Sequence, residues 1–269
     1  MKAIVLHSVV PVRSQPSEGA EQETQLLFGE TCSITDEVPR WYKIVNDYDG
    51  QTGWVDFKMI TKMSDEEYEQ YTASDLTAMV KMPMAYAVSE GNGQTFPLTA
   101  GTRLSNYKEG RFEVLGSVFR IDPQMVAEKP LELTKDNFMQ LIRYFLNIPY
   151  LWGGKNCMGL DCSGLSGIVL SLFGCKLLRN AREQVNQGTE VGFLSEAQCG
   201  DLVFFDHQSR DPEDTRISHV GILLSPDTVI HCSGRVKVER IDSNGIINTE
   251  TGQYSHDLRA IRRYLELKG

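Results

Sequence analysis

Three side chains with the chemistry of a thiol-dependent hydrolase occur in order along the chain: Cys162, His219 and His231. Gly-rich turns precede Cys162 and an apolar run follows it, so we predict that this cysteine opens a helix. A helix N-terminus favours a thiolate and lowers the thiol pKa, and its free N–H groups suit a developing oxyanion. A cysteine nucleophile also needs a base and a group that orients the base. The two histidines are the candidates for these roles.

The histidines flank a predicted turn at Ser225-Pro226-Asp227 and therefore belong to adjacent antiparallel strands. Their side chains face the same side only if the connection has an odd number of residues or contains a bulge. The sequence leaves that register open. If they do share a face, His219 accepts the thiol proton and His231 orients His219.

Helices must precede these strands. Thr134 is a predicted N-cap for an amphipathic helix that ends at Pro149, and a second helix is expected from Cys162 to Phe173, closed by Gly174. Glycines at 164 and 167 cost helix propensity, which indicates close approach of another group. Strand-like runs follow, and they are Asp201–Asp206, His219–Leu224, Val229–Cys232, Val236–Ile241 and Ala260–Tyr264. Helices followed by an antiparallel sheet predict an α+β domain over residues 128–269.

The sequence of the N-terminal half predicts small β-sheet domains. Residues 1–62 form a small β-barrel in this interpretation, with a first strand at Ala3–Val12 and a hairpin turn at Asp49-Gly50. Residues 63–76 are a short helical linker. Residues 77–127 repeat the β-rich pattern and are expected to be a second, degenerate barrel of the same type.

Composition excludes several classes of protein. The chain of 269 residues has 27 Lys and Arg against 36 Asp and Glu, a net charge of −9, which argues against nucleic acid and against an anionic membrane as partners. No apolar run reaches about 18 residues, so no membrane insertion is expected. Neither the six cysteines nor the histidines have zinc-site spacing, and we expect no metal and no cofactor. The apolar N-terminal run is too short for a signal peptide, which favours a cytoplasmic location, with the periplasm or cell envelope as the alternative if a leader has been removed.

Five motifs occur in order in the C-terminal half. They are Tyr150-x-Trp152-Gly153-Gly154, Asp161-Cys162-Ser163-Gly164, Gly200-Asp201-Leu202-Val203-Phe204-Phe205, Ser218-His219-Val220-Gly221-Ile222 and the later His231. This set resembles the NlpC-type family of cysteine endopeptidases, which cut peptidoglycan stem peptides. The resemblance implies a papain-like fold in which Cys162 is the nucleophile, His219 the general base and acid, and His231 the orienting residue. It also implies that substrate contacts come from the other motif side chains, which are Tyr150, Trp152, Asp161, Ser163 and Ser218.

The first barrel carries a resemblance of its own. Leu26-Leu27-Phe28-Gly29-Glu30, Trp41-Tyr42-Lys43-Ile44 and Gly53-Trp54-Val55 resemble the bacterial Src-homology-3-like domain. Together with the C-terminal motifs, this domain resembles the dipeptidyl-peptidase subgroup, which acts on released stem peptides with a free N-terminal L-Ala. The resemblance implies that Glu30 helps to bind the amine. Gln51 stands where the subgroup has a tyrosine, and Tyr48, three residues earlier, is a candidate substrate contact of the barrel.

The function implied is hydrolysis of the γ-D-glutamyl to L-diamino acid bond in murein-derived peptides. The alternatives are an amidase or acyltransferase on the same Cys-His-His triad, and a non-catalytic cell-wall-binding protein. The polar segment from Arg179 to Gln184 is interpreted as a solvated surface.

Overall fold

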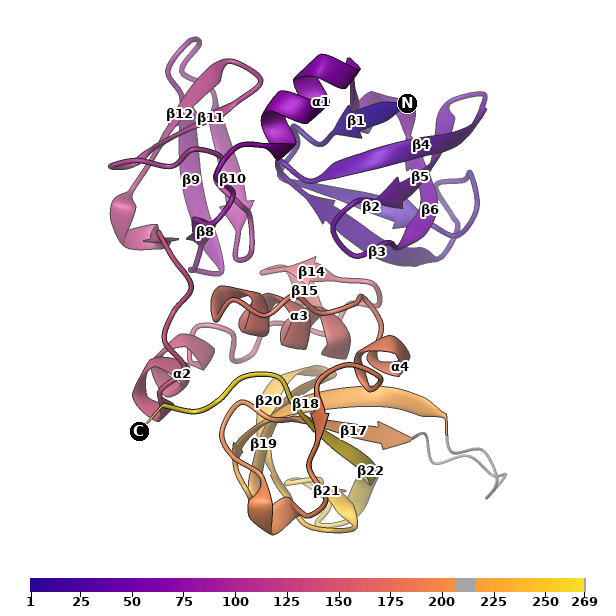
Figure 1. The fold of residues 1–269 in the computed structure, drawn as a ribbon. Helices are drawn as coiled ribbons and strands as arrows, with labels where there is room; N and C mark the ends of the chain where they lie inside the picture. The colour runs from indigo at the N-terminus through magenta and orange to yellow at the C-terminus, as the bar shows by residue number, and fades with distance from the viewer. Residues whose placement is uncertain (207–215, 269) are drawn as a thin grey trace. The chain divides into compact units, whose positions relative to one another are not determined.

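The computed structural model describes residues 1–206 and 216–268. The chain divides into two compact units (Figure 1). The N-terminal unit is Met1–Pro130 together with Trp152–Cys157, and the C-terminal unit is Leu131–Leu151 together with Met158–Gly269.

The N-terminal unit begins with a seven-stranded antiparallel sheet in the order β3-β2-β6-β5-β4-β1-β7. Its strands are β1 (Lys2–Ile4), β2 (Val9–Arg13), β3 (Gln22–Leu27), β4 (Thr31–Val38), β5 (Trp41–Asn46), β6 (Thr52–Asp56) and β7 (Thr61–Met63), with a 3-10 turn at Phe57–Met59. The expected hairpin joins β5 to β6, and Gly50 adopts a φ of 76° there, a conformation that favours glycine.

One sequence prediction in this sheet is wrong. Residues Ala3–Val12 do not form one strand, because the chain bends at His7 and Ser8 and divides the segment into β1 and β2. β1 pairs with β4 and β7, whereas β2 pairs with β3 and β6. An apolar alternating run does not reveal such a bend, since both halves of the run are buried.

A capped helix follows the first sheet. α1 (Asp65–Thr72) starts in a capping box in which the Ser64 side chain accepts from the Glu67 amide and the Glu67 carboxylate accepts from the Ser64 amide. Tyr71 of α1 is buried and donates its hydroxyl proton to the Gly29 carbonyl at 2.9 Å. The linker helix is therefore part of a packed core and is more than a tether.

The remainder of the N-terminal unit holds two small antiparallel sheets, a four-stranded one in the order β10-β9-β12-β11 and a two-stranded one of β13 and β8. Their strands are β8 (Met79–Val80), β9 (Met84–Ser89), β10 (Thr95–Thr99), β11 (Arg111–Val114), β12 (Ser117–Ile121) and β13 (Val126–Ala127), with a 3-10 turn at Pro123–Met125. Phe112 and Phe119 stack within the apolar core beside Phe28, so this core includes the side chain that follows β3 of the first sheet. The short β14 (Lys155–Asn156) also belongs to this unit.

The C-terminal unit is built on a sheet in the order β16-β22-β17-β18-β19-β20-β21, which closes on itself because β22 also pairs with β21. Its strands are β15 (Gly159–Leu160), β16 (Thr189–Glu190), β17 (Leu202–Asp206), β18 (Ile217–Ser225), β19 (Thr228–Ser233), β20 (Arg235–Ile241), β21 (Gly245–Ile247) and β22 (Tyr254–Arg263), of which β15 lies outside this sheet. Its helices are α2 (Lys135–Ile142), α3 (Cys162–Leu172) and α4 (Ala181–Gln184), with a 3-10 turn at Leu194–Glu196. In Figure 1 α3 lies over the sheet, and it packs on β18 and β19.

The α+β architecture expected from the sequence is confirmed, with one correction to its first helix. Thr134 is the N-cap of α2 and accepts from the Asn137 amide at 3.2 Å, as predicted. The helix ends at Ile142 rather than at Pro149, because the chain continues in tight turns and Asn147 adopts a φ of 67°. The apolar pattern continues past Ile142 because turn residues such as Phe145 and Ile148 are also buried.

Candidate active site

The site begins where α3 starts. Asp161 is the N-cap of α3, and its Oδ1 atom accepts from the Gly164 amide at 2.6 Å. Cys162 is therefore the first residue of an apolar helix, as the sequence predicts, and is 8% exposed. A Cβ atom added at Gly167 would meet no other atom within 4 Å among the described residues, so the close approach expected at that glycine is not found.

A buried arginine holds the N-cap carboxylate. Arg179 donates to Asp161 through Nη1 to Oδ1 at 3.1 Å and through Nη2 to Oδ2 at 2.6 Å, and it also donates to the Ser163 hydroxyl at 2.9 Å. The interpretation of this segment as a solvated surface is wrong: Arg179 is 4% exposed and Gln184 is fully buried. No local pattern in the sequence marked this pair, because Arg179 and Asp161 lie 18 residues apart and meet only in the packed fold.

Burial dominates the electrostatics of the thiol. It raises the pKa of Cys162 to about 12, with the Asp161 carboxylate adding to the rise. Hydrogen bonds from the amides of Val220 and Ser163 oppose it, as does the charge of Arg179. The expected lowering by the helix N-terminus is therefore outweighed, because desolvation penalises an isolated thiolate in this position.

The register of the β18–β19 hairpin decides where the histidines face. Ser225 pairs with Thr228, but beyond a register shift Leu223 pairs with Val229 and Gly221 pairs with His231. Directly paired residues project from the same face of a sheet, and Gly221 shares its face with His219 two residues earlier. The shift between Leu223 and Ser225 therefore brings the two imidazoles onto one face.

The two histidines and a glutamate form a continuous hydrogen-bonded chain. His219 Nε2 lies 2.8 Å from His231 Nδ1, and His231 Nε2 lies 2.8 Å from Oε2 of Glu239. All three residues are buried, with exposures of 6%, 0% and 4%. Cys162 is brought to the same strand, since its thiol accepts from the amide of Val220, the residue after His219.

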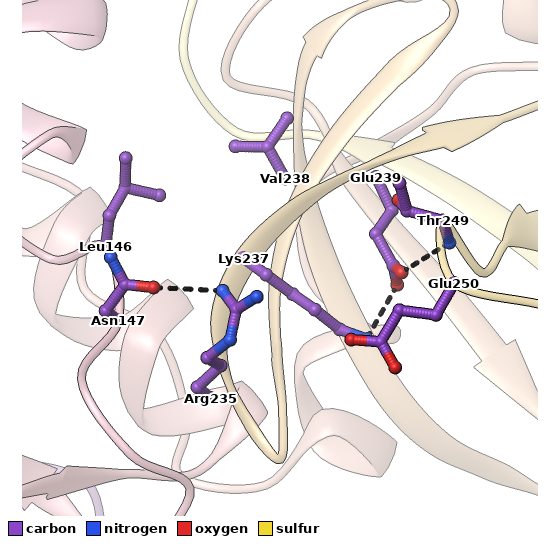
Figure 2. A pocket seen from close by; sticks show the side chains of 8 residues that line it. All are labelled: Leu146, Asn147, Arg235, Lys237, Val238, Glu239, Thr249 and Glu250. Atoms are coloured by element: carbon purple, nitrogen blue, oxygen red, sulfur yellow. Dashed lines mark hydrogen bonds and ion pairs between the residues drawn. The ribbon is translucent and has the colours of Figure 1, made fainter.

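Glu239 was missed by the sequence analysis. It lies on β20, where Val229 pairs with Glu239 and His231 with Lys237, so its side chain shares the face of His231. Its carboxylate accepts from Lys237 Nζ at 3.0 Å and from the Thr249 amide at 3.0 Å, contacts visible in Figure 2. These donors and His231 hold the pKa of Glu239 at about 2 despite burial. One acidic residue in a charged strand carries no sequence signal, because strand pairing alone defines its neighbour.

Burial also keeps both imidazoles neutral. Desolvation lowers the pKa of His219 well below its usual value, and the nearby His231, His256 and Lys237 add to that shift. Desolvation likewise lowers the pKa of His231, although the Glu239 carboxylate opposes it. Both rings are therefore uncharged near neutral pH and can accept a proton during a reaction.

The remaining predicted site residues divide between the two units. In the C-terminal unit Tyr150 is partly buried. Burial raises the pKa of its phenol, and so does the charge of an ionised Cys162, so the hydroxyl and the thiol interact electrostatically. Ser163 donates to Asp161 Oδ1 at 3.1 Å, and Ser218 is exposed. The other three, which are Trp152, Glu30 and Tyr48, belong to the N-terminal unit.

The N-terminal residues are engaged within their own unit. The Glu30 carboxylate pairs with Lys155 Nζ at 3.1 Å, and Lys155 is 7% exposed. Tyr48 faces the guanidinium of Arg103, 5.0 Å from the ring centroid. Trp152 is 56% exposed, while its carbonyl accepts from the Gln22 side chain. The Glu30 carboxylate, which was expected to bind the substrate amine, is therefore already paired with the Lys155 ammonium.

Across residues 1–206 and 216–268, no group of three or more His, Cys, Asp or Glu side chains could hold a metal ion. Within the same residues, no helix is both long and apolar enough to cross a membrane.

Two stretches of the chain match known families. Residues 147–254 match the NlpC/P60 family, and residues 8–60 match the bacterial SH3 domain. The chain is 28% identical to the gamma-D-glutamyl-L-lysine dipeptidyl-peptidase of Bacillus subtilis, covering 90% of this chain and 80% of that protein. It is 25% identical to the dipeptidyl-peptidase 6 of Lysinibacillus sphaericus, covering 90% of this chain and 92% of that protein.

A solved structure has the same fold. The crystal structure of an NlpC/P60 family protein from Bacillus cereus aligns with a TM-score of 0.83 at 21% identity, over 99% of this chain and 100% of that one. The two chains therefore share a fold over nearly their whole length.

Proposed function

We propose that this chain, an NlpC/P60 cysteine peptidase with an N-terminal bacterial SH3 domain, hydrolyses the γ-D-glutamyl to L-diamino acid bond of murein-derived peptides. The observation that supports the chemistry is the buried chain of His219, His231 and Glu239, together with the hydrogen bond that the helix-opening Cys162 receives from Val220, the residue after His219. A thiol next to an uncharged, oriented imidazole is the arrangement required for nucleophilic attack on an amide carbonyl.

In this proposal His219 removes the proton of Cys162 as the sulfur attacks the γ-carbonyl carbon, so thiolate and imidazolium form together. The imidazolium then protonates the leaving amine as the C–N bond breaks, leaving an acyl-enzyme. Water attacks the thioester carbonyl and gives its proton to His219, and that proton returns to the sulfur when the C–S bond breaks. His231 holds His219 in orientation throughout. No step draws on a metal or cofactor.

The substrate proposal is supported by the relatives. Two proteins that align with 90% of this chain are named as dipeptidyl-peptidases, one of them a gamma-D-glutamyl-L-lysine dipeptidyl-peptidase. We propose that this enzyme likewise removes L-Ala-γ-D-Glu from peptides with a free N-terminal amine. Tyr150, Asp161, Ser163 and Ser218 are the proposed substrate contacts in the C-terminal unit.

We also infer that residues 77–127 are a second, degenerate barrel of the SH3-like type. The inference is supported by the short antiparallel strands β8 to β13 and by the aromatic side chains that they place in a core, which include Phe112 and Phe119.

The deciding experiment is mass spectrometry of L-Ala-γ-D-Glu-diaminopimelate and its N-acetyl form after incubation with the enzyme. We expect release of L-Ala-D-Glu and free diamino acid from the unblocked peptide, with no dependence on a second acceptor. Acceptor-dependent products would indicate an acyltransferase. Equal rates on the free and acetylated peptides would contradict the requirement for a free amine and leave the Cys162 chemistry standing.

A further inference from the structure

From the geometry we propose that Glu239 is a positioning residue of this active site, which acts through His231 to set the tautomer of His219 and to stabilise the imidazolium formed when Cys162 loses its proton. The inference deepens, and rests on, the proposed peptidase function. It adds a fourth member to the set of Cys162, His219 and His231.

The tautomer follows from the donors and acceptors along the chain. The Glu239 carboxylate receives the Lys237 ammonium and the Thr249 amide, both of which only donate, so it remains ionised and acts only as an acceptor. The Nε2 atom of His231 must then carry its proton, and the Nδ1 atom of the neutral ring accepts. His219 Nε2 therefore donates to His231, which leaves Nδ1 of His219 without a proton and able to accept one.

The hydrogen bond between Glu239 and His231 also places a negative charge at the end of the histidine pair. Thiolate and imidazolium are each unfavourable alone in a buried site, and they form together only if the separated charges are stabilised. Glu239 is the negative group hydrogen-bonded to the far end of the histidine pair, so it favours the imidazolium. At the other end, the charge of the buried Arg179 favours the thiolate, whereas the Asp161 carboxylate with which it pairs opposes it.

A pocket lies beside this carboxylate. It has a volume of about 360 Å³, and Figure 2 shows Glu239 at its wall with Lys237 and Thr249 beside it. Glu250 also lines this pocket. Truncating Glu239 would open a void continuous with this pocket, in which the Lys237 ammonium and the Thr249 amide could still hold a small carboxylate.

The test is Glu239→Ala, compared with Glu250→Ala, which removes a carboxylate from the same pocket. Alkylation of Cys162 by iodoacetamide at pH 7 and kcat on the stem tripeptide are measured with and without sodium formate, with sodium chloride as the salt control. We expect both rates to fall by roughly 10- to 100-fold in Glu239→Ala with KM unchanged, as for the loss of a charged hydrogen bond. Formate should restore much of both rates, and Glu250→Ala should match the wild type with or without formate.

Wild-type rates in Glu239→Ala, an equal loss in Glu250→Ala, or a loss in a folded variant that formate does not restore would each overturn the proposal. If Glu239→Ala does not fold, Glu239→Gln keeps the side-chain volume and removes the charge. Its alkylation at pH 7 should be slowed, and an unchanged rate would overturn the proposal. Because alkylation needs no peptide, a wild-type enzyme that failed to cleave stem peptides would refute the proposed substrate while Glu239 was still tested.

Discussion

His219 Nε2 lies 2.8 Å from His231 Nδ1, and the irregular pairing between Leu223 and Ser225 makes this contact possible. Without the shift, a two-residue turn would pair His231 with Ile222 and direct the two imidazoles to opposite faces. The contact also depends on Gly221, which lies directly opposite His231. A Cβ atom there would lie 2.5 Å from Val229 Cγ2 and 3.2 Å from His231 Cβ.

Gly221→Ala is therefore expected to displace His231 and lower kcat by about tenfold, with a loss of unfolding free energy of ~1–3 kcal/mol from overpacking. Combining it with Val229→Ala removes the closest clashing atom and should restore part of the activity. Gly167→Ala in α3 is the matched control, because its added Cβ meets nothing among the described residues. Steady-state kinetics and urea denaturation measure both effects. A fully active Gly221→Ala enzyme would show that His231 tolerates displacement.

Cys162→Ala and Cys162→Ser should abolish turnover and leave the fold intact. A hydroxyl cannot supply a comparable nucleophile near neutral pH. Peptide mapping after alkylation should show that substrate protects Cys162 and leaves the partly exposed Cys175 reactive. Significant turnover by either variant would assign the nucleophile elsewhere.

His219→Ala should cost more activity than His231→Asn. Removal of the group that moves the proton is expected to lower kcat by about 10²- to 10⁴-fold. The Asn side chain can still accept one hydrogen bond from His219, so we expect a smaller loss. Measured kcat values in the reverse order would exchange the two roles.

Lys237→Met should move the acid limb of the pH–rate profile to higher pH. The Lys237 ammonium contributes to the lowered pKa of both His219 and His231, so its removal lets both imidazoles take up protons more readily. The Lys237–Glu239 ion pair also shares the carboxylate oxygen bonded to His231. The measurement is kcat as a function of pH, and a limb that stays in place or moves to lower pH would contradict this reading.

The two buried histidines should make the fold sensitive to acid. Their folded-state pKa values lie below the usual value of 6.5, so below that pH the unfolded chain binds more protons than the folded one. Stability is then present above pH 6.5 and falls as the pH is lowered, by about 1.4 kcal/mol per pH unit for each histidine that stays neutral. Urea denaturation between pH 7.5 and 5.5 measures this slope. The double variant His219→Ala, His231→Asn should have a shallower slope, and an identical slope would contradict the assignment.

Much of the C-terminal unit could be predicted from local sequence. The Thr134 cap, the helix that opens at Cys162 and the order of the later strands depend on side-chain period and on neighbours a few residues apart. The helix end at Ile142 and the division of Ala3–Val12 could not be predicted, because a buried turn and a buried strand present the same apolar pattern.

The sequence by itself determined which side chains are the candidates for thiol chemistry. They are Cys162, His219 and His231, identified by the motifs in which they occur and by their order along the chain. Only the tertiary structure decided that the histidines share a face, that Arg179 is buried against Asp161 and that Glu239 completes the chain. The physical reason is the range of the interactions. Motifs record neighbours along the chain, whereas a bulge sets the register of a strand pair, and a buried charge is neutralised by whichever partner the packed sheet brings within hydrogen-bonding distance.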